Sequence, residues 1–191
     1  MIGQTTSNLQ DIREAQKKLL ELNYNYWIDD VLFSFNWWFL ILLTLMPWLL
    51  WYRFVDKKRI MEIVLMGILI IITTVIYDIL GVSFLLWSYN YNVIQMVPFH
   101  ITIDFAIVPI GYMLVYQLFQ HWKSYIFALA IVAAVASFVV EPLFVWMGIY
   151  KVISWKHIYS FFAYFIMGII MKFLVRKIID KQVKANTNFL E

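Results

Sequence analysis

The fold class follows from residues 60–81, IMEIVLMGILIIITTVIYDILG, a run in which only Glu62 and Asp78 are charged. Four further apolar stretches accompany it, at residues 31–52, 97–119, 125–147 and 158–175. Each is near the ~20 residues that a helix needs to cross a bilayer. In lipid such segments must be helical, because unpaired backbone groups find no water there. The sequence therefore predicts an all-α, polytopic transmembrane helical bundle with five crossings, within a domain at 31–178.

The composition supports this class. Hydrophobic residues make up 63% of the 191 residues and charged residues 14%, with a mean hydropathy of +0.76. A soluble domain carries ~25% charged residues, so a soluble globule and a disordered chain are excluded. The chain has no cysteine, which excludes disulfides, thiolate nucleophiles and Cys-based metal sites. The net charge of +3 comes mainly from short tails and turns, so membrane lipids are the expected partners and nucleic acid is not.

Residues 1–30 form a polar N-terminal segment. Ser7 followed by Gln10 is a candidate capping box, and apolar residues from Leu9 to Tyr26 recur at roughly helical spacing. This pattern predicts an amphipathic helix over residues 7–26 that lies on the membrane surface. A helix that docks onto a partner protein is the alternative.

Helix ends and basic residues predict the topology. Asp29 and Asp30 could cap the first crossing. Five alternating crossings place the two most basic segments, 53–59 and 172–184, on the same side together with Lys123. By the positive-inside rule that side is the cytoplasm. The N-terminus is then outside, and the polar tail at 179–191 is cytoplasmic.

Two segments of the chain also show a weak similarity to each other. Asp78 precedes an apolar stretch that leads to Trp87, and 63 residues later Glu141 precedes a stretch that leads to Tyr150. This spacing predicts a parallel repeat, with residues 60–119 matching residues 124–175. A repeat of this kind often has a site between its halves. Chance similarity between apolar segments is the alternative.

Four ionisable residues share a depth near the outer boundary, and they form the candidate catalytic cluster: Asp78, His100, Asp104 and Glu141. At 1.5 Å per residue, all four fall within ~10 Å of that boundary. A charge at the centre of a bilayer costs ~2.5–3.5 kcal/mol, which makes such a set a candidate functional site. The alternative is structural: each residue snorkels, caps a helix, or satisfies backbone that a nearby proline has broken.

His100 and Asp104 are four residues apart, which places them on one face of a helix. Such a pair can pass protons, and with a third carboxylate it would suit a zinc ion. Ligand types alone do not show convergence, so no metal and no other cofactor is predicted. Four aromatic residues near the acids are predicted to line a ligand pocket: Trp87, Tyr89, Tyr112 and Trp146. Simple packing is the alternative role for these rings.

Two resemblances bear on function. The first rests on a pattern that covers most of residues 24–178, with Asp78, Trp87, Tyr89, Pro98, Asp104, Pro109, Glu141, Trp146 and Tyr150 as its landmarks. It is similar to a family of small integral membrane proteins from spore-forming Gram-positive bacteria. That resemblance implies a multi-pass protein of the bacterial plasma membrane and no known activity.

The second resemblance is to the heterodimer-type lycopene (carotenoid) cyclases, and it rests on Asp78, Trp87 and Tyr89. It implies that a carboxylic acid, here Asp104 or Glu141, protonates a polyene. The paired acids that those enzymes carry after a proline are absent after Pro98.

Three classes of function remain open. The preferred one is a protein that binds a lipid, a hydrophobic small molecule or a partner at an outer-leaflet polar and aromatic pocket. An enzyme that modifies an isoprenoid or another lipid is the alternative. A small transporter is less favoured, because five helices are few for a monomer and no acid continues the cluster inward. A transporter of this size would need a homo-oligomer or a membrane-protein partner.

Overall fold

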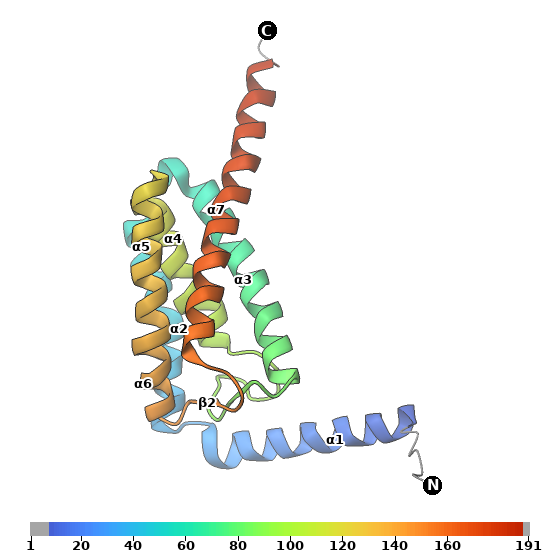
Figure 1. The fold of residues 1–191 in the computed structure, drawn as a ribbon. Helices are drawn as coiled ribbons and strands as arrows, with labels where there is room; N and C mark the ends of the chain where they lie inside the picture. Colours follow the sequence, from blue (N-terminus) through green and yellow to red (C-terminus); the bar gives the residue numbers. More distant parts are fainter. Residues whose placement is uncertain (1–7, 189–191) are drawn as a thin grey trace.

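The computed structural model describes residues 8–188, and the chain folds into a mostly helical bundle (Figure 1). Four stretches are long and apolar enough to cross a membrane: α2 (Phe35–Phe54), α3 (Ile60–Ser83), α5 (Trp122–Val135) with its continuation α6 (Glu141–Trp146), and α7 (His157–Asn188). A fifth apolar helix, Ile103–Leu118, is shorter and contains α4 (Val108–Leu118). All five helices overlap the predicted stretches, although α7 continues to Asn188, past residue 175 and into the predicted tail at 179–191. The helical prediction is confirmed, and the structure fits an integral membrane protein.

The first helix, α1 (Leu9–Tyr26), leaves the bundle sideways (Figure 1), and none of its residues is buried. Its N-cap is Asn8, whose side chain accepts from the Gln10 amide, while Asp11 accepts from the Asn8 amide at 2.9 Å. The capping box therefore starts one residue later than the predicted pair. Ser7 lies outside the described residues.

The predicted cap of the first crossing is wrong. Asp29 and Asp30 lie in a π-helical turn, η1 (Trp27–Val31), and α2 begins only after it. Ser34 caps α2 instead, because its hydroxyl accepts from the Trp37 amide at 3.2 Å. The cap of α2 is therefore the short side chain of Ser34, next to the first helical turn, and the carboxylates of Asp29 and Asp30 are exposed.

Two short strands join the halves of the chain at one end of the bundle. β1 (Trp87–Tyr89) follows α3, and β2 (Tyr150–Val152) follows α6, and they pair antiparallel. We call this the strand end. The central pair is Ser88 and Lys151, whose numbers differ by the same 63 as those of Asp78 and Glu141. This register is compatible with the parallel repeat of residues 60–119 and 124–175, which stays a prediction.

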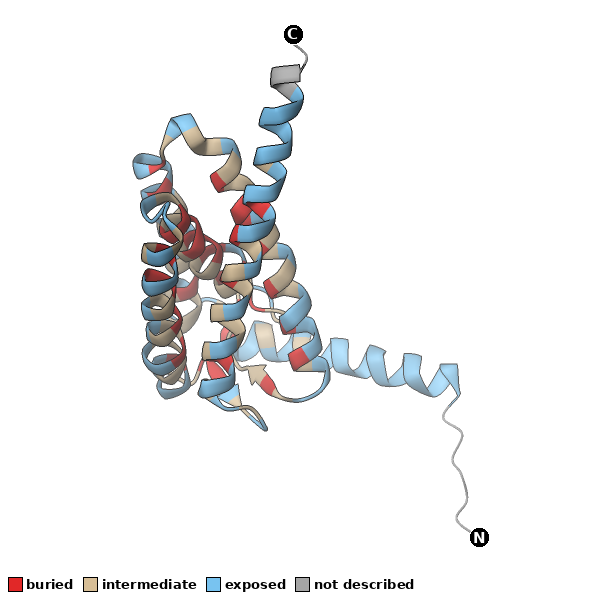
Figure 2. Cartoon of the chain, turned by 45° about the horizontal axis from the view of Figure 1, so that its top comes forward, coloured by how far each residue is buried: buried red, intermediate tan, exposed pale blue. Residues whose placement is uncertain are grey.

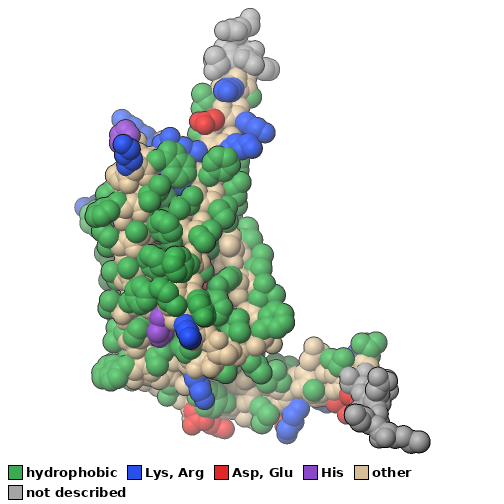
Figure 3. Space-filling view, viewed as in Figure 1, with side chains coloured by type: hydrophobic (Ala, Val, Ile, Leu, Met, Phe, Trp, Pro, Cys, Tyr) green, Lys and Arg blue, Asp and Glu red, His purple; other side chains and the backbone are tan. Residues whose placement is uncertain are grey.

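The opposite end carries basic residues. The 3₁₀ turn η2 (Lys57–Arg59) connects α2 to α3 there, and Lys123 opens α5 at the same end. Figure 3 shows Lys and Arg side chains gathered at this basic end, with hydrophobic side chains covering the bundle between the two ends. Burial is confined to the inward faces of the helices (Figure 2). An apolar outer surface of this extent is typical of contact with lipid.

Two further π-helical turns stand before prolines and shape the interior. η3 (Ile103–Ile107) precedes Pro109, and η4 (Ala136–Val140) precedes Pro142. Proline has no N–H, so a carbonyl in the preceding turn loses its helical donor. The carbonyl of Phe105 accepts from the Trp48 indole at 2.8 Å instead. Both turns lie beside acids, because η3 contains Asp104 and η4 leads into Glu141.

Gly81 allows the strand end to close on α3. A Cβ at this position would lie 1.9 Å from the Trp87 ring, whereas a Cβ at Gly111 would meet nothing within 4 Å. We expect Gly81→Ala to lower the free energy of unfolding by ~1–3 kcal/mol, because an added methyl group forces the ring to shift. Gly111→Ala should leave it unchanged or raise it by ~0.5–1 kcal/mol. Denaturation of both variants in detergent tests this, and equal unfolding free energies would contradict the close approach.

Candidate functional site

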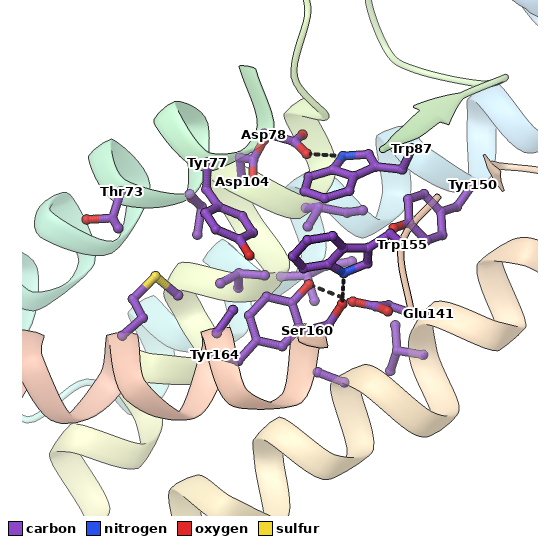
Figure 4. Close-up of a pocket in the computed structure, with 18 of the residues that line it drawn as sticks. Thr73, Tyr77, Asp78, Trp87, Asp104, Glu141, Tyr150, Trp155, Ser160 and Tyr164 are labelled. Atoms are coloured by element: carbon purple, nitrogen blue, oxygen red, sulfur yellow. Dashed lines mark hydrogen bonds between the residues drawn. The ribbon is translucent and has the colours of Figure 1, made fainter. Parts of the chain in front are cut away.

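A cavity of about 470 Å³ lies in the half of the bundle nearest the strand end (Figure 4). Its walls come from α3, from η3 and α4, from η4 and α6, and from α7, and side chains of the two strands close one end. Most of the lining residues are apolar. The charged ones are three acids, Asp78, Asp104 and Glu141, and among residues 8–188 no basic side chain lines the cavity.

Asp78 is a buried acceptor near the end of α3. Its Oδ1 accepts from the Trp87 indole at 2.8 Å and from the Tyr89 hydroxyl at 2.7 Å. Its Oδ2 accepts from the His100 amide at 2.8 Å. Burial raises the pKa of the Tyr89 phenol well above its usual range, so this hydroxyl stays protonated and remains a donor. Three donors therefore surround one carboxyl that is only 5% exposed.

Asp104 lies against Asp78. Its Oδ2 accepts from the same His100 amide at 3.1 Å, and the two carboxyl groups are neighbours in Figure 4. Two carboxylates in one site repel each other, and the repulsion is relieved when they share a proton. The bulge η3 turns Asp104 inward, where it is 3% exposed and still lines the cavity. The pair can therefore accept a hydrogen bond from a ligand or exchange a proton with it.

Glu141 forms a second polar site in the same cavity. Its Oε2 pairs with His157 Nδ1 at 2.7 Å, and its Oε1 accepts from the Tyr164 hydroxyl at 2.9 Å. Trp155 donates to the nearby Ser160 hydroxyl at 2.9 Å. The structure thus brings together the three acids that were predicted from their common depth.

An aromatic wall connects the two polar sites (Figure 4). The rings of Trp87 and Trp155 lie edge to face with centroids 5.2 Å apart, and Tyr77 packs against both at 5.8 and 6.2 Å. Trp87 is hydrogen-bonded to Asp78 and Trp155 to Ser160. Such a wall offers apolar contact area and negative ring faces, which suit a hydrophobic or cationic ligand.

The four aromatic residues predicted to line the pocket divide into two groups. Trp87 and Tyr89 line the cavity. Tyr112 lies outside it, where its hydroxyl donates to the Tyr164 carbonyl at 2.6 Å. The prediction for Trp146 is wrong, because α6 turns this residue outward and leaves it 83% exposed. The sequence placed Trp146 at the right depth on the wrong face of its helix.

His100 lies just before the helix, where its carbonyl accepts from the Asp104 amide at 2.9 Å, and the predicted pair between its imidazole and the Asp104 carboxyl is not seen. The helix begins after His100, and it is the backbone amide that reaches both carboxyls. The imidazole is fully buried behind the cavity wall, edge-on to Tyr89 at 4.7 Å, and Nε2 has no hydrogen-bond partner among the described residues. No group of three or more His, Asp and Glu residues within 8–188 could hold a metal ion.

Sequence reasoning missed the polar face of α7. His157, Ser160 and Tyr164 recur at three- and four-residue spacing on a helix that is otherwise apolar in this region, and all three lie around Glu141. That spacing is a visible signal of one shared helix face.

Comparisons with protein-family models, with curated proteins and with solved structures find no match to this chain. The fold and the site by themselves define a class: a helical bundle of membrane-spanning length around a cavity lined by acids.

We expect Asp78→Ala to lower the free energy of unfolding by ~3 kcal/mol or more, at ~1–3 kcal/mol for each buried donor left without an acceptor. Asp30→Ala, at an exposed position, is the matched control and should change it little. Adding Trp87→Phe to Asp78→Ala should cost less than the two single changes together, because one orphaned donor is removed. Detergent denaturation compares the wild type with the three single variants and the double variant, and strictly additive effects would contradict the hydrogen bond.

Proposed function

We propose that this protein binds a lipid or another hydrophobic small molecule inside the acid-lined cavity. The observation that carries the proposal is the cavity itself, a largely apolar space of about 470 Å³ within helices of membrane-spanning length. Ligand sites are concave and mostly apolar, with a few convergent polar groups, and the three acids supply those groups.

The polar end of the ligand is a hydrogen-bond donor. The acids of the cavity offer acceptor oxygens, and no basic side chain among the described lining residues would hold an anion. Asp78 already accepts three hydrogen bonds, whereas Asp104 accepts one from the His100 amide and interacts with the side chains of Thr74 and Asp78. A hydroxyl or an ammonium group beside Asp104 would use its remaining lone pairs. An anionic headgroup would be repelled.

The topology proposed with this function has five crossings. The shorter helix Ile103–Leu118 spans the bilayer together with the buried loop before it. The side chain of Asn92 supports that loop, since it donates to the Phe99 carbonyl at 2.7 Å and accepts from the Ile101 amide at 3.2 Å. Irregular backbone at membrane depth is tolerated where protein satisfies it.

In this topology the strand end faces the outside and the basic end faces the cytoplasm, as the positive-inside rule requires. The chain then starts outside, with α1 at the outer surface. The apolar residues of α1 follow one side of the helix while Lys17, Lys18 and Glu21 lie on the other. Its sideways exit from the bundle (Figure 1) supports a helix in the plane of the membrane surface.

A second candidate function is an enzyme that acts on an isoprenoid or another lipid by proton transfer. The observation that favours it is the Asp78–Asp104 pair, which faces the same cavity as Glu141 and an aromatic wall. A carboxyl group in contact with the reacting atom can act as general acid or base.

Filling the cavity tests the binding function. We expect Ala163→Phe, whose site lines the cavity, to remove a specific small molecule that co-purifies with the wild-type protein, because the new ring takes its space. Ala134→Phe is the control on α5, at a residue that lines no described pocket. Mass spectrometry of extracts from the purified proteins compares them. Identical molecules in both variants and the wild type would argue against a ligand in the cavity.

Asp104→Asn separates the two candidate functions. The amide keeps the size of the side chain and removes its acidic proton. Under the binding function the co-purifying molecule stays unmodified in both proteins and its amount falls in the variant. Under the enzyme function the wild type also carries a converted product that the variant lacks.

The absence of cysteine makes the topology directly testable. We expect a single cysteine at Lys151, exposed at the strand end, to react with a membrane-impermeant maleimide in intact cells. A cysteine at Lys123, exposed at the basic end, should react only after the membrane is opened. The reverse pattern would overturn the orientation, and labelling of both in intact cells would overturn the crossing number.

A further inference from the structure

A smaller pocket of about 270 Å³ adjoins the cavity between α4 and α5. Its lining includes five residues that also line the main cavity: Ile107, Val108, Ala136, Val140 and Tyr164. The two spaces therefore adjoin each other at these side chains. We call the smaller one the α4–α5 groove.

The far wall of the groove lies at the exposed surface of the bundle. Ile131 and Val135 line it from α5 and are 50% and 47% exposed. From α4 the lining includes Gly111, where a Cβ would meet nothing within 4 Å. A contrast is given by Gly168, where a Cβ would lie 2.7 Å from Leu129 and from Tyr112. Thus α7 packs closely against α4 and α5 at Gly168, whereas open space adjoins Gly111 of α4.

The chemistry of the groove suits hydrocarbon. None of its described lining residues is charged, and the only side-chain polar atoms are the hydroxyls of Tyr112 and Tyr164. Tyr112 donates its proton to the Tyr164 carbonyl, and Tyr164 donates its proton to Glu141. No hydroxyl proton is left for a ligand, so the groove offers apolar contact alone.

We propose that the α4–α5 groove holds the hydrocarbon chain of a single-chain amphiphile whose polar end lies beside Asp104. This inference rests on the proposed binding function and adds the ligand class to it. The chain passes the shared side chains, Tyr164 among them, and leaves past Gly111 into the bilayer. The lining that the groove shares with the cavity points to this occupant, because an alkyl or isoprenoid tail is the apolar part that such a headgroup would carry.

Photo-crosslinking in lipid nanodiscs tests the path of the chain. The probes are two forms of hexadecan-1-ol, one with a diazirine near the hydroxyl and one with it near the chain end. The first should label residues 73–78 and 160–164, and the second residues 111–112 and 131–135. Excess unlabelled hexadecan-1-ol should compete with both. Labelling of Leu49, exposed on α2, reports bulk lipid contact and should not be competed.

Variants that block the groove sharpen the test. Gly111→Trp fills the α4–α5 groove from α4, and Ile131→Trp fills it from α5. If one of the two variants fails to fold, the other still tests the groove. Each should abolish competed chain-end labelling and keep head-end labelling. Ile126→Trp, at a residue of α5 that lines neither pocket, should retain both.

The outcomes separate this inference from the proposed function. Competed head-end labelling with chain-end labelling outside 111–112 and 131–135 would overturn the groove and leave the cavity as the binding site. Unchanged chain-end labelling in both groove variants would also overturn it. Absence of any competed labelling in the wild-type protein would overturn binding of such an amphiphile altogether, and the groove with it.

Discussion

A carboxylate at membrane depth must find its hydrogen-bond donors within the protein, and the strand end of this bundle is built around that constraint. Asp78 obtains two donors from Trp87 and Tyr89 of β1 and a third from the His100 amide, just before the helix Ile103–Leu118. Those contacts tie the end of α3 to the strand and to the returning helix. Without them three buried donors would be unsatisfied, at ~1–3 kcal/mol each. The acid, the missing side chain at Gly81 and the Trp87 ring therefore form one unit.

The second half of the chain meets the same constraint with different residues. Glu141 stands 63 residues after Asp78 and receives its partners from the beginning of its own returning helix, through His157 and Tyr164. The strands pair about Ser88 and Lys151, separated by the same number. An acid near the end of one helix, a short strand and a returning helix that satisfies the acid occur twice. Residues from both units line the cavity.

The sequence predicts the helices well and the faces of their residues poorly. Long apolar segments must be helical in lipid, so the five helices coincide with the apolar stretches of the sequence. The common depth of Asp78, Asp104 and Glu141 follows from the same runs, which is why their meeting in one cavity could be anticipated. The rotation of a helix end depends on packing and on bulges. For that reason the sequence pattern does not show that Trp146 faces outward, that His100 lies just before its helix, or that α7 has a polar side.

Proline supplies the irregularity that turns a packed bundle into one with a cavity. A regular helix through residues 103–107 would present a different face at Asp104, and a regular helix through 136–140 would rotate Glu141. Each π-helical turn inserts an extra residue into the helical repeat, and the lost backbone donor is replaced by a side chain such as Trp48. The same turns contribute Ile107, Ala136 and Val140, which line both the cavity and the groove. The inward position of the acids and the apolar lining shared by the cavity and the groove thus both depend on the same kind of local distortion, which occurs in two neighbouring helices.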